Sequence, residues 1–143
     1  MKSIISKTML LVVLAVSFMS FAKKPGGEGY EIFVGSKLVI QQFGATSGSV
    51  QSLQLNPTNT GDKISVKYYH CGQPGKDRVI TIKDETGAQV KEIRYNDSPT
   101  ANSVMTIEVR ELLTVKKGKT GKLSLYYVAK GMPSSRLLTT ISL

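Results

Sequence analysis

Short runs in which apolar and polar residues alternate recur along the chain from about residue 30 to its end. Residues 64–69, 105–110 and 123–127 follow this pattern strictly, with Val, Ile, Leu, Met or Tyr at every second position. Successive side chains of a strand point to opposite faces of its sheet, so a period of two buries one face and exposes the other. The pattern predicts antiparallel strands of a β-sandwich or barrel.

The sequence predicts nine short strands that are rich in β-branched or aromatic residues and bounded by Gly, Pro, Asn, Asp or Ser. They are Tyr30–Val34, Lys37–Phe43, Val50–Leu55, Lys63–His70, Arg78–Lys83, Gln89–Tyr95, Val104–Arg110, Lys122–Ala129 and Leu137–Leu143. Asp84–Gly87 is predicted to be a tight hairpin turn, and residues 116–121 a second turn after one helical turn at Glu111–Leu113. Since no long window after residue 29 has the helical period, the sequence predicts one all-β domain.

The first 22 residues have the composition of a secretory signal peptide. Lys2 and Lys7 precede the apolar run Met9–Val16, and the small residues Ser20 and Ala22 stand where a signal peptidase cleaves. The apolar run is too short to span a bilayer, for which ~20 residues are needed, so cleavage is predicted rather than anchoring. We therefore expect a signal peptide over 1–22, a flexible Gly-rich leader over 23–29, a β-sandwich over 30–143, and an exported, periplasmic or extracellular protein.

Composition narrows the classes further. The 143 residues carry a net charge of +9 and are 41% hydrophobic, which excludes an intrinsically disordered chain. The predicted signal peptide holds two lysines and no acid, so its removal lowers the net charge to +7. One Cys excludes an internal disulfide, and one His with one Cys is too few for a dedicated zinc site. No cofactor and no metal site are predicted.

Two segments have the pattern of a known architecture. Residues 78–90 read as an apolar strand that runs into Asp84-Glu85-Thr86-Gly87 and returns, and residues 104–127 read as a strand, a Leu112-Leu113 corner and a second strand. This pattern resembles small immunoglobulin-like modules of secreted bacterial proteins, without the Cys and Trp signature of antibody domains. The resemblance implies a single antiparallel immunoglobulin-like β-sandwich of about seven to nine strands.

The loop Asn56–Gly61 suggests a function. Its sequence, Asn-Pro-Thr-Asn-Thr-Gly, is similar to the Asn-Pro-Thr-Thr-Gly loop of chagasin-type cysteine protease inhibitors, with Asn59 as an extra residue. The resemblance implies inhibition of a papain-like protease through this loop. An Asn-Pro-Thr turn with a Gly is also common in loops that have no such role.

His70 and Cys71 are the only residues of their types and are adjacent at a predicted strand end. They could form a reactive thiol, with Cys71 as the candidate, or contribute a metal ligand, with His70 as the candidate. Adjacent strand residues point to opposite faces, which makes a shared site awkward. The alternative is that His70 is a partly buried residue of the apolar face and Cys71 a small buried one.

Two further groups are candidate binding residues. Four positive charges gather in the predicted turn at Lys116, Lys117, Lys119 and Lys122, which suits an anionic glycan or another cell-envelope surface. Tyr69 and Tyr126 would form an aromatic patch if they faced outward on neighbouring strands. A solvated lysine loop and tyrosines that only stabilise the sheet are the alternatives.

The sequence thus favours an exported binding or interaction module over an enzyme. It contains no spaced carboxylate pair, nucleophile elbow, His-Glu-x-x-His motif or P-loop. The expected partner is another exported protein or an anionic glycan of the cell envelope, with no role for nucleic acid. Protease inhibition and a thiol- or metal-dependent activity at His70 and Cys71 remain as alternatives.

Overall fold

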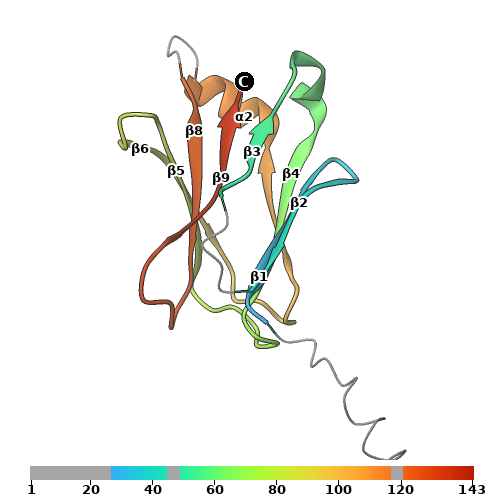
Figure 1. Cartoon of the computed structure of the whole chain (residues 1–143), viewed down its shortest axis with the longest axis vertical. Coiled ribbons are helices and arrows are strands. Elements are labelled where there is room, and N and C mark those ends of the chain that lie inside the picture. The colour runs from blue at the N-terminus through green and yellow to red at the C-terminus, as the bar shows by residue number, and fades with distance from the viewer. Residues whose placement is uncertain (1–26, 45–48, 117–120) are drawn as a thin grey trace, which may run out of the picture.

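Two β-sheets pack face to face in the computed structural model, which describes residues 27–44, 49–116 and 121–143 (Figure 1). The predicted signal peptide and leader residues 23–26 lie outside the described residues. At the leader's end, β1 already begins at Gly29, and Glu28 makes polar contacts that are described below. Among the described residues, no helix combines the length and apolarity needed to cross a bilayer.

The first sheet has four strands in the order β2-β1-β4-β7, all antiparallel to their neighbours. Their bounds are β1 Gly29–Val34, β2 Lys37–Phe43, β4 Lys63–Tyr69 and β7 Val104–Glu108. Along β1, the inward-facing residues Tyr30 and Ile32 are buried, as the period of two predicts. Glu31 and Phe33 lie on the outer face.

The second sheet has five strands in the order β3-β9-β8-β5-β6. Their bounds are β3 Ser52–Gln54, β5 Arg78–Lys83, β6 Gln89–Tyr95, β8 Leu123–Val128 and β9 Arg136–Ser142. In this sheet β9, β8, β5 and β6 have the order of strands G, F, C and C′ of a variable-type immunoglobulin domain, while β1, β4 and β7 have the order of A, B and E. The predicted all-β sandwich is confirmed, and all nine predicted strands are present.

Two elements differ from the prediction. β3 pairs in parallel with β9 at the edge of the second sheet, to which the chain has crossed after β2 of the first sheet. The single helical turn predicted at Glu111–Leu113 is an eight-residue helix, α2, over Val109–Lys116. Val109 continues the period of two from β7, but it also stands three and four residues before Leu112 and Leu113. The helical period prevails there, and Val109 and Leu112 are both fully buried.

The core lies between the two sheets and is closed at one end by α2, at the top of Figure 1. It is built from aliphatic side chains of nearly every strand, and tyrosines gather toward the opposite end. The largest fully buried side chains are Tyr30, Tyr127, Ile32, Ile64, Ile80, Ile82, Met105, Ile107, Leu112, Leu125, Leu138 and Ile141. Burial of this apolar set is the main force that holds the two sheets together.

Candidate functional site

The only His lies at the end of β4, and the only Cys lies in the turn that follows. His70 bridges to Gln73, and the Gln73 N–H donates to the His70 carbonyl at 2.9 Å. Cys71 and Gly72 between them have φ values of 51° and 83°, as a tight type I′ turn requires. Cys71 is a free, exposed thiol, so its interpretation as a buried residue is wrong. His70 instead continues the inner face of β4 and is half-buried.

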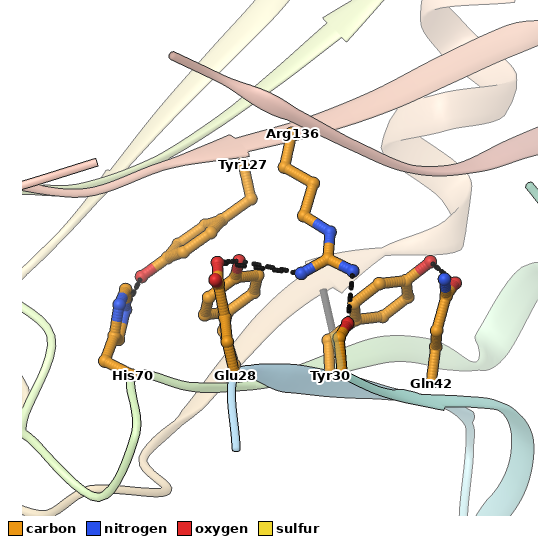
Figure 2. Close-up of polar contacts among 8 residues, drawn as sticks. Glu28, Tyr30, Gln42, His70, Tyr127 and Arg136 are labelled. Carbon is orange, nitrogen blue, oxygen red and sulfur yellow. Dashed lines mark hydrogen bonds and ion pairs between the residues drawn. The ribbon is translucent and has the colours of Figure 1, made fainter. Parts of the chain in front are cut away.

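His70 meets Tyr127 from the opposite sheet. The His70 Nε2 atom lies 2.8 Å from the Tyr127 hydroxyl (Figure 2). The ring of Tyr68 lies 4.8 Å from the imidazole and 4.4 Å from the Tyr127 ring. Burial lowers the pKa of His70 and raises the pKa of Tyr127. Both directions favour a neutral imidazole whose Nε2 accepts a hydrogen bond from the protonated Tyr127 hydroxyl. This pair is therefore a hydrogen bond between two neutral groups that links the sheets.

Arg136, at the start of β9, lies at the centre of the same group of residues and contacts several of them. Its guanidinium lies 5.2 Å from the Tyr30 ring centre and 5.9 Å from that of Tyr68, donates to the Tyr68 hydroxyl at 3.3 Å and pairs with Glu28 at 3.6 Å. The Tyr68 hydroxyl donates to the Glu28 carboxylate. Burial and this hydrogen bond raise the pKa of Tyr68 to about 12, so the phenol stays protonated. Arg136 also reaches the Gly44 carbonyl at 3.5 Å.

Tyr30 completes the cluster by meeting a β-bulge. Leu125 pairs with Thr139 and Tyr126 with Leu137, so Leu138 is an extra residue in β9. The Tyr30 hydroxyl donates to the Leu138 carbonyl at 2.7 Å and lies 2.8 Å from Gln42 Oε1. A hydroxyl from the first sheet thus satisfies a carbonyl that the bulge leaves out of the β8–β9 ladder.

We name Glu28, Tyr30, Gln42, Tyr68, His70, Tyr127 and Arg136 the inter-sheet cluster. Figure 2 shows Tyr127 and Arg136 reaching down from one sheet toward the labelled residues of the other. In the described part of the chain, no buried side-chain nitrogen or oxygen lacks a hydrogen-bond partner. No group of three His, Cys, Asp or Glu there could hold a metal ion. With its phenols protonated and its donors paired, the cluster serves to cross-link the sheets.

Arg78 is a buried cation that the sequence did not single out, whereas Arg136 is partly buried. Its Nε and Nη2 donate to the Asn96 carbonyl at 3.0 and 2.7 Å, and its Nη1 donates to the Ser103 carbonyl at 3.3 Å. A signal for it existed, because Arg78 has the same phase as the buried Ile80 and Ile82. Arg136 had no such signal, since the bulge at Leu138 breaks the alternation of β9.

The two tyrosines predicted to share a patch lie apart. Tyr69 is in β4 of the four-stranded sheet and Tyr126 in β8 of the other, so they are not on neighbouring strands and the single aromatic patch is a wrong prediction. Tyr69 donates to Glu31 at 2.8 Å and its ring lies 5.5 Å from that of Phe43. The Tyr126 ring lies under the Lys83 ammonium, 4.8 Å away.

The outer face of the four-stranded sheet is where exposed apolar side chains gather. Leu38, Phe43 and Val104 are 42%, 51% and 45% exposed, and Phe33 and Tyr69 are half-buried beside them. The register places all five on the same side: Leu38 opposite Phe33, Phe43 and Tyr69 on either side of Gly29, and Val104 opposite Lys67. We name these five residues the face patch.

Gly29 is what allows Phe43 to lie flat on this sheet. A Cβ atom at Gly29 would stand 2.4 Å from Phe43 Cδ1 and 2.6 Å from the Gln42 carbonyl. The absence of a side chain lets the ring cover the strand backbone and meet Tyr69. Lys67 lies 5.1 Å over the neighbouring Phe33 ring, and the register places Glu31 and Lys67 between Phe33 and the Phe43–Tyr69 pair.

Of the two other predicted sites, the basic turn is only partly described, whereas the Asn56–Gly61 loop lies within the described residues. Lys117 and Lys119 of the basic turn lie outside the described residues, Lys116 ends α2, and Lys122 is exposed. The Asn56–Gly61 loop forms a 3-10 helix, η2, over Pro57–Gly61, with the Asn56 N–H donating to Asn59 Oδ1 at 2.9 Å. Protease inhibition through this segment stays a prediction.

Comparison with known proteins leaves the function to be argued from the molecule itself. No protein-family model matches the chain, and no match is found among the curated proteins.

Proposed function

We propose that this protein is an exported, non-catalytic binding module that attaches to another exported protein through the face patch. The observation that carries the proposal is the gathering of Leu38, Phe43 and Val104 on one sheet face. Exposed apolar side chains scattered singly are ordinary, whereas several on one face together with aromatic residues can mark a docking surface. Here a row of Gln41, Glu31 and Lys67 runs between the Leu38–Phe33 pair and the Phe43–Tyr69 pair.

The chemistry of the patch favours a protein over a glycan. Its exposed members include the aliphatic Leu38 and Val104, which offer a sugar no stacking surface but can fill apolar pockets of a protein. Phe43 and Tyr69 provide large, rigid contact area of the kind that carries most interface energy.

The overall charge of the molecule, rather than the face itself, adds a preference for acidic surfaces. On this sheet Lys63 is paired with Glu108 at 3.2 Å, whereas the exported chain as a whole would carry a net charge of +7. Such a balance steers an acidic partner toward the protein and makes association depend on salt. We therefore expect a partner that offers apolar pockets to this face and carries a net negative charge.

The test begins with a photo-crosslinking amino acid at Thr106 on this face, with one at Thr81 on the outer face of the other sheet as control, in the producing cells. The adduct formed from Thr106 identifies the partner, which is then purified for direct binding by calorimetry. Leu38→Ser and Val104→Ser should each weaken binding by about tenfold or more, because burial of one such side chain contributes roughly 1.5–3 kcal/mol.

Val50→Ser is the matched control, since Val50 is 40% exposed but lies outside the four-stranded sheet. It should change the affinity less than about twofold. Adducts formed equally from Thr81, or equal losses in all three Ser variants, would reject the face patch as the site. Salt-sensitive retention on an anionic polysaccharide that the Ser variants leave unchanged would favour the glycan instead.

A further inference from the structure

Four strands lie at sheet edges: β2 and β7 in one sheet, β3 and β6 in the other. The outer side of an edge strand presents backbone N–H and C=O groups that can pair with another chain. Soluble proteins block such pairing by charges, bulges, short strands or side-chain caps. The four edges differ in how they are blocked.

Three edges carry such a device. Lys91 of β6 stands opposite the buried Ile82, so its side chain points inward, where it pairs with Glu111 of α2 at 2.9 Å. The Thr106 carbonyl of β7 accepts the Tyr95 hydroxyl at 2.7 Å. β3 has only three residues. A strand that approached these edges would meet a charge at β6, an occupied backbone acceptor at β7, and a strand too short for a ladder at β3.

β2 is different over its second half. Its seven residues contain one charge, Lys37, at the start, and residues 38–43 are uncharged. A bulge at Val39 interrupts the first half, since Ile32 pairs with Ile40 and Phe33 with Leu38. The segment Ile40–Phe43 beyond the bulge is regular, uncharged and rich in strand-forming residues.

The backbone direction along this segment follows from one hydrogen bond. The Gly44 N–H donates to the Glu28 carbonyl at 2.8 Å, so Gly44 faces β1. Because the ladder alternates, Gln42 and Ile40 also face β1, while the N–H and C=O groups of Gln41 and Phe43 point away from the sheet. The other side of β1 agrees: Gly35 N–H donates to the Lys63 carbonyl, which puts the odd-numbered residues of β1 toward β4.

We propose that β2 pairs with β2 of a second copy of this chain, antiparallel and about a two-fold axis at Gln42. In this register Gln41 of one copy lies opposite Phe43 of the other, and the two pairs form four backbone hydrogen bonds. Lys37 stays outside the paired stretch, so two positively charged molecules meet along an uncharged strand. A copy of the same strand is the simplest occupant because its donors and acceptors are self-complementary at this centre.

The pairing has a consequence for the surface. An antiparallel pair about an axis normal to the sheet joins the two four-stranded sheets side by side, and it places both outer faces on one side. The two face patches would then be carried by one continuous surface. A partner that repeats its own site would bind such a dimer with an avidity beyond that of a single patch.

Hydrogen exchange on the mature chain at low and high protein concentration tests the proposal, together with sedimentation velocity. We expect a dimer that grows with concentration, and slowing of exchange by about tenfold at the amides of Gln41 and Phe43. The Gln42 amide, already bonded to β1, should be protected at both concentrations. Gln41→Pro removes one outward N–H, which an edge strand tolerates, and should leave the chain monomeric.

If Gln41→Pro lowers the stability of the sheet, Phe43→Lys serves as the second variant. It is expected to abolish the dimer because it brings like charges to the pairing stretch. Val104→Ser is the control, since Val104 lies at the opposite edge of the sheet and should leave the dimer intact. A wild-type chain that stays monomeric up to about 1 mM, or a dimer that both β2 variants retain, would overturn the proposal. Neither result affects the partner-binding test of Val104→Ser.

Discussion

At the scale of single residues, the most consequential side chains are two arginines inside the sandwich. A buried cation is costly unless its donors are satisfied. Arg136 has an ion pair and two aromatic rings, whereas Arg78 makes its hydrogen bonds to two backbone carbonyls. Arg78 thus ties the ends of β5 and β6 to the segment that enters β7.

Arg78→Met should lower the free energy of unfolding by about 2 kcal/mol, because it removes three charge-assisted hydrogen bonds from a buried guanidinium to the part-buried carbonyls of Asn96 and Ser103. Arg94→Met is the control: this side chain is 77% exposed, and its loss should cost less than about 0.5 kcal/mol. Urea unfolding of the three proteins measures both values. Similar losses in the two variants would mean that the Arg78 contacts do not stabilise the fold.

His70 makes stability depend on pH in a definite direction. Burial lowers its pKa in the folded protein, with the Glu28 carboxylate opposing and Arg78 reinforcing that shift, while Tyr68 and Tyr127 pack against the ring. The unfolded chain therefore binds a proton more readily than the folded one. The stability tied to neutral His70 is complete above the ordinary His pKa of about 6.5 and is lost as the pH falls below it.

Urea unfolding at pH 7.5 and pH 5 of the wild type and of His70→Gln checks this expectation. The wild type should lose more stability than the variant between the two pH values, because other groups titrate equally in both. Equal losses would show that His70 protonates as easily in the folded protein as in the unfolded chain.

At the scale of elements, departures from regular strands determine one inter-sheet hydrogen bond, the length of the regular β2 edge and the position of α2. The bulge in β9 frees the Leu138 carbonyl, and Tyr30 from the opposite sheet reaches it. The bulge in β2 limits regular edge backbone to the segment from Ile40 onward. α2 exists because Val109, Leu112 and Leu113 fit one helix face better than a continued strand.

Tyr30→Phe should lower the free energy of unfolding by about 1–2 kcal/mol, since it leaves a buried carbonyl without its donor and changes no apolar packing. Tyr126→Phe, on the outer face of the other sheet, should have an effect below about 0.5 kcal/mol. Chemical denaturation at neutral pH provides the comparison. No difference between the two variants would mean that the Leu138 carbonyl finds another donor, for example water.

At the scale of the whole molecule, the described residues form one sandwich around one core. Among them, the buried hydrophobic residues of the core run from Tyr30 to Ile141. Cleavage at the predicted site would therefore leave all of these residues in the exported chain.

When the full chain is produced in a bacterium that exports proteins, the purified product should begin at Lys23. N-terminal sequencing and intact mass measure this directly. A product that keeps Met1 in the membrane fraction would contradict cleavage after Ala22. A variant in which the −1 residue is bulky, Ala22→Leu, should keep the uncleaved mass.

Much of the architecture could be predicted from the sequence alone. The period of two in residues 64–69, 105–110 and 123–127 determines which side chains are buried, because a strand offers only two faces. Strand number, the all-β class and the inward position of His70 follow from it. The buried Arg78 was also readable from its phase with Ile80.

Only the tertiary structure determined which residues from different strands lie close together. The separation of Tyr69 from Tyr126 follows from the sheet to which each strand belongs, and the parallel β3–β9 pair from where the chain crosses. The inter-sheet cluster joins Glu28 to Arg136 across more than a hundred residues. The face patch likewise combines Leu38 with Val104, whose nearness no local pattern encodes, because strand order is set by long-range packing.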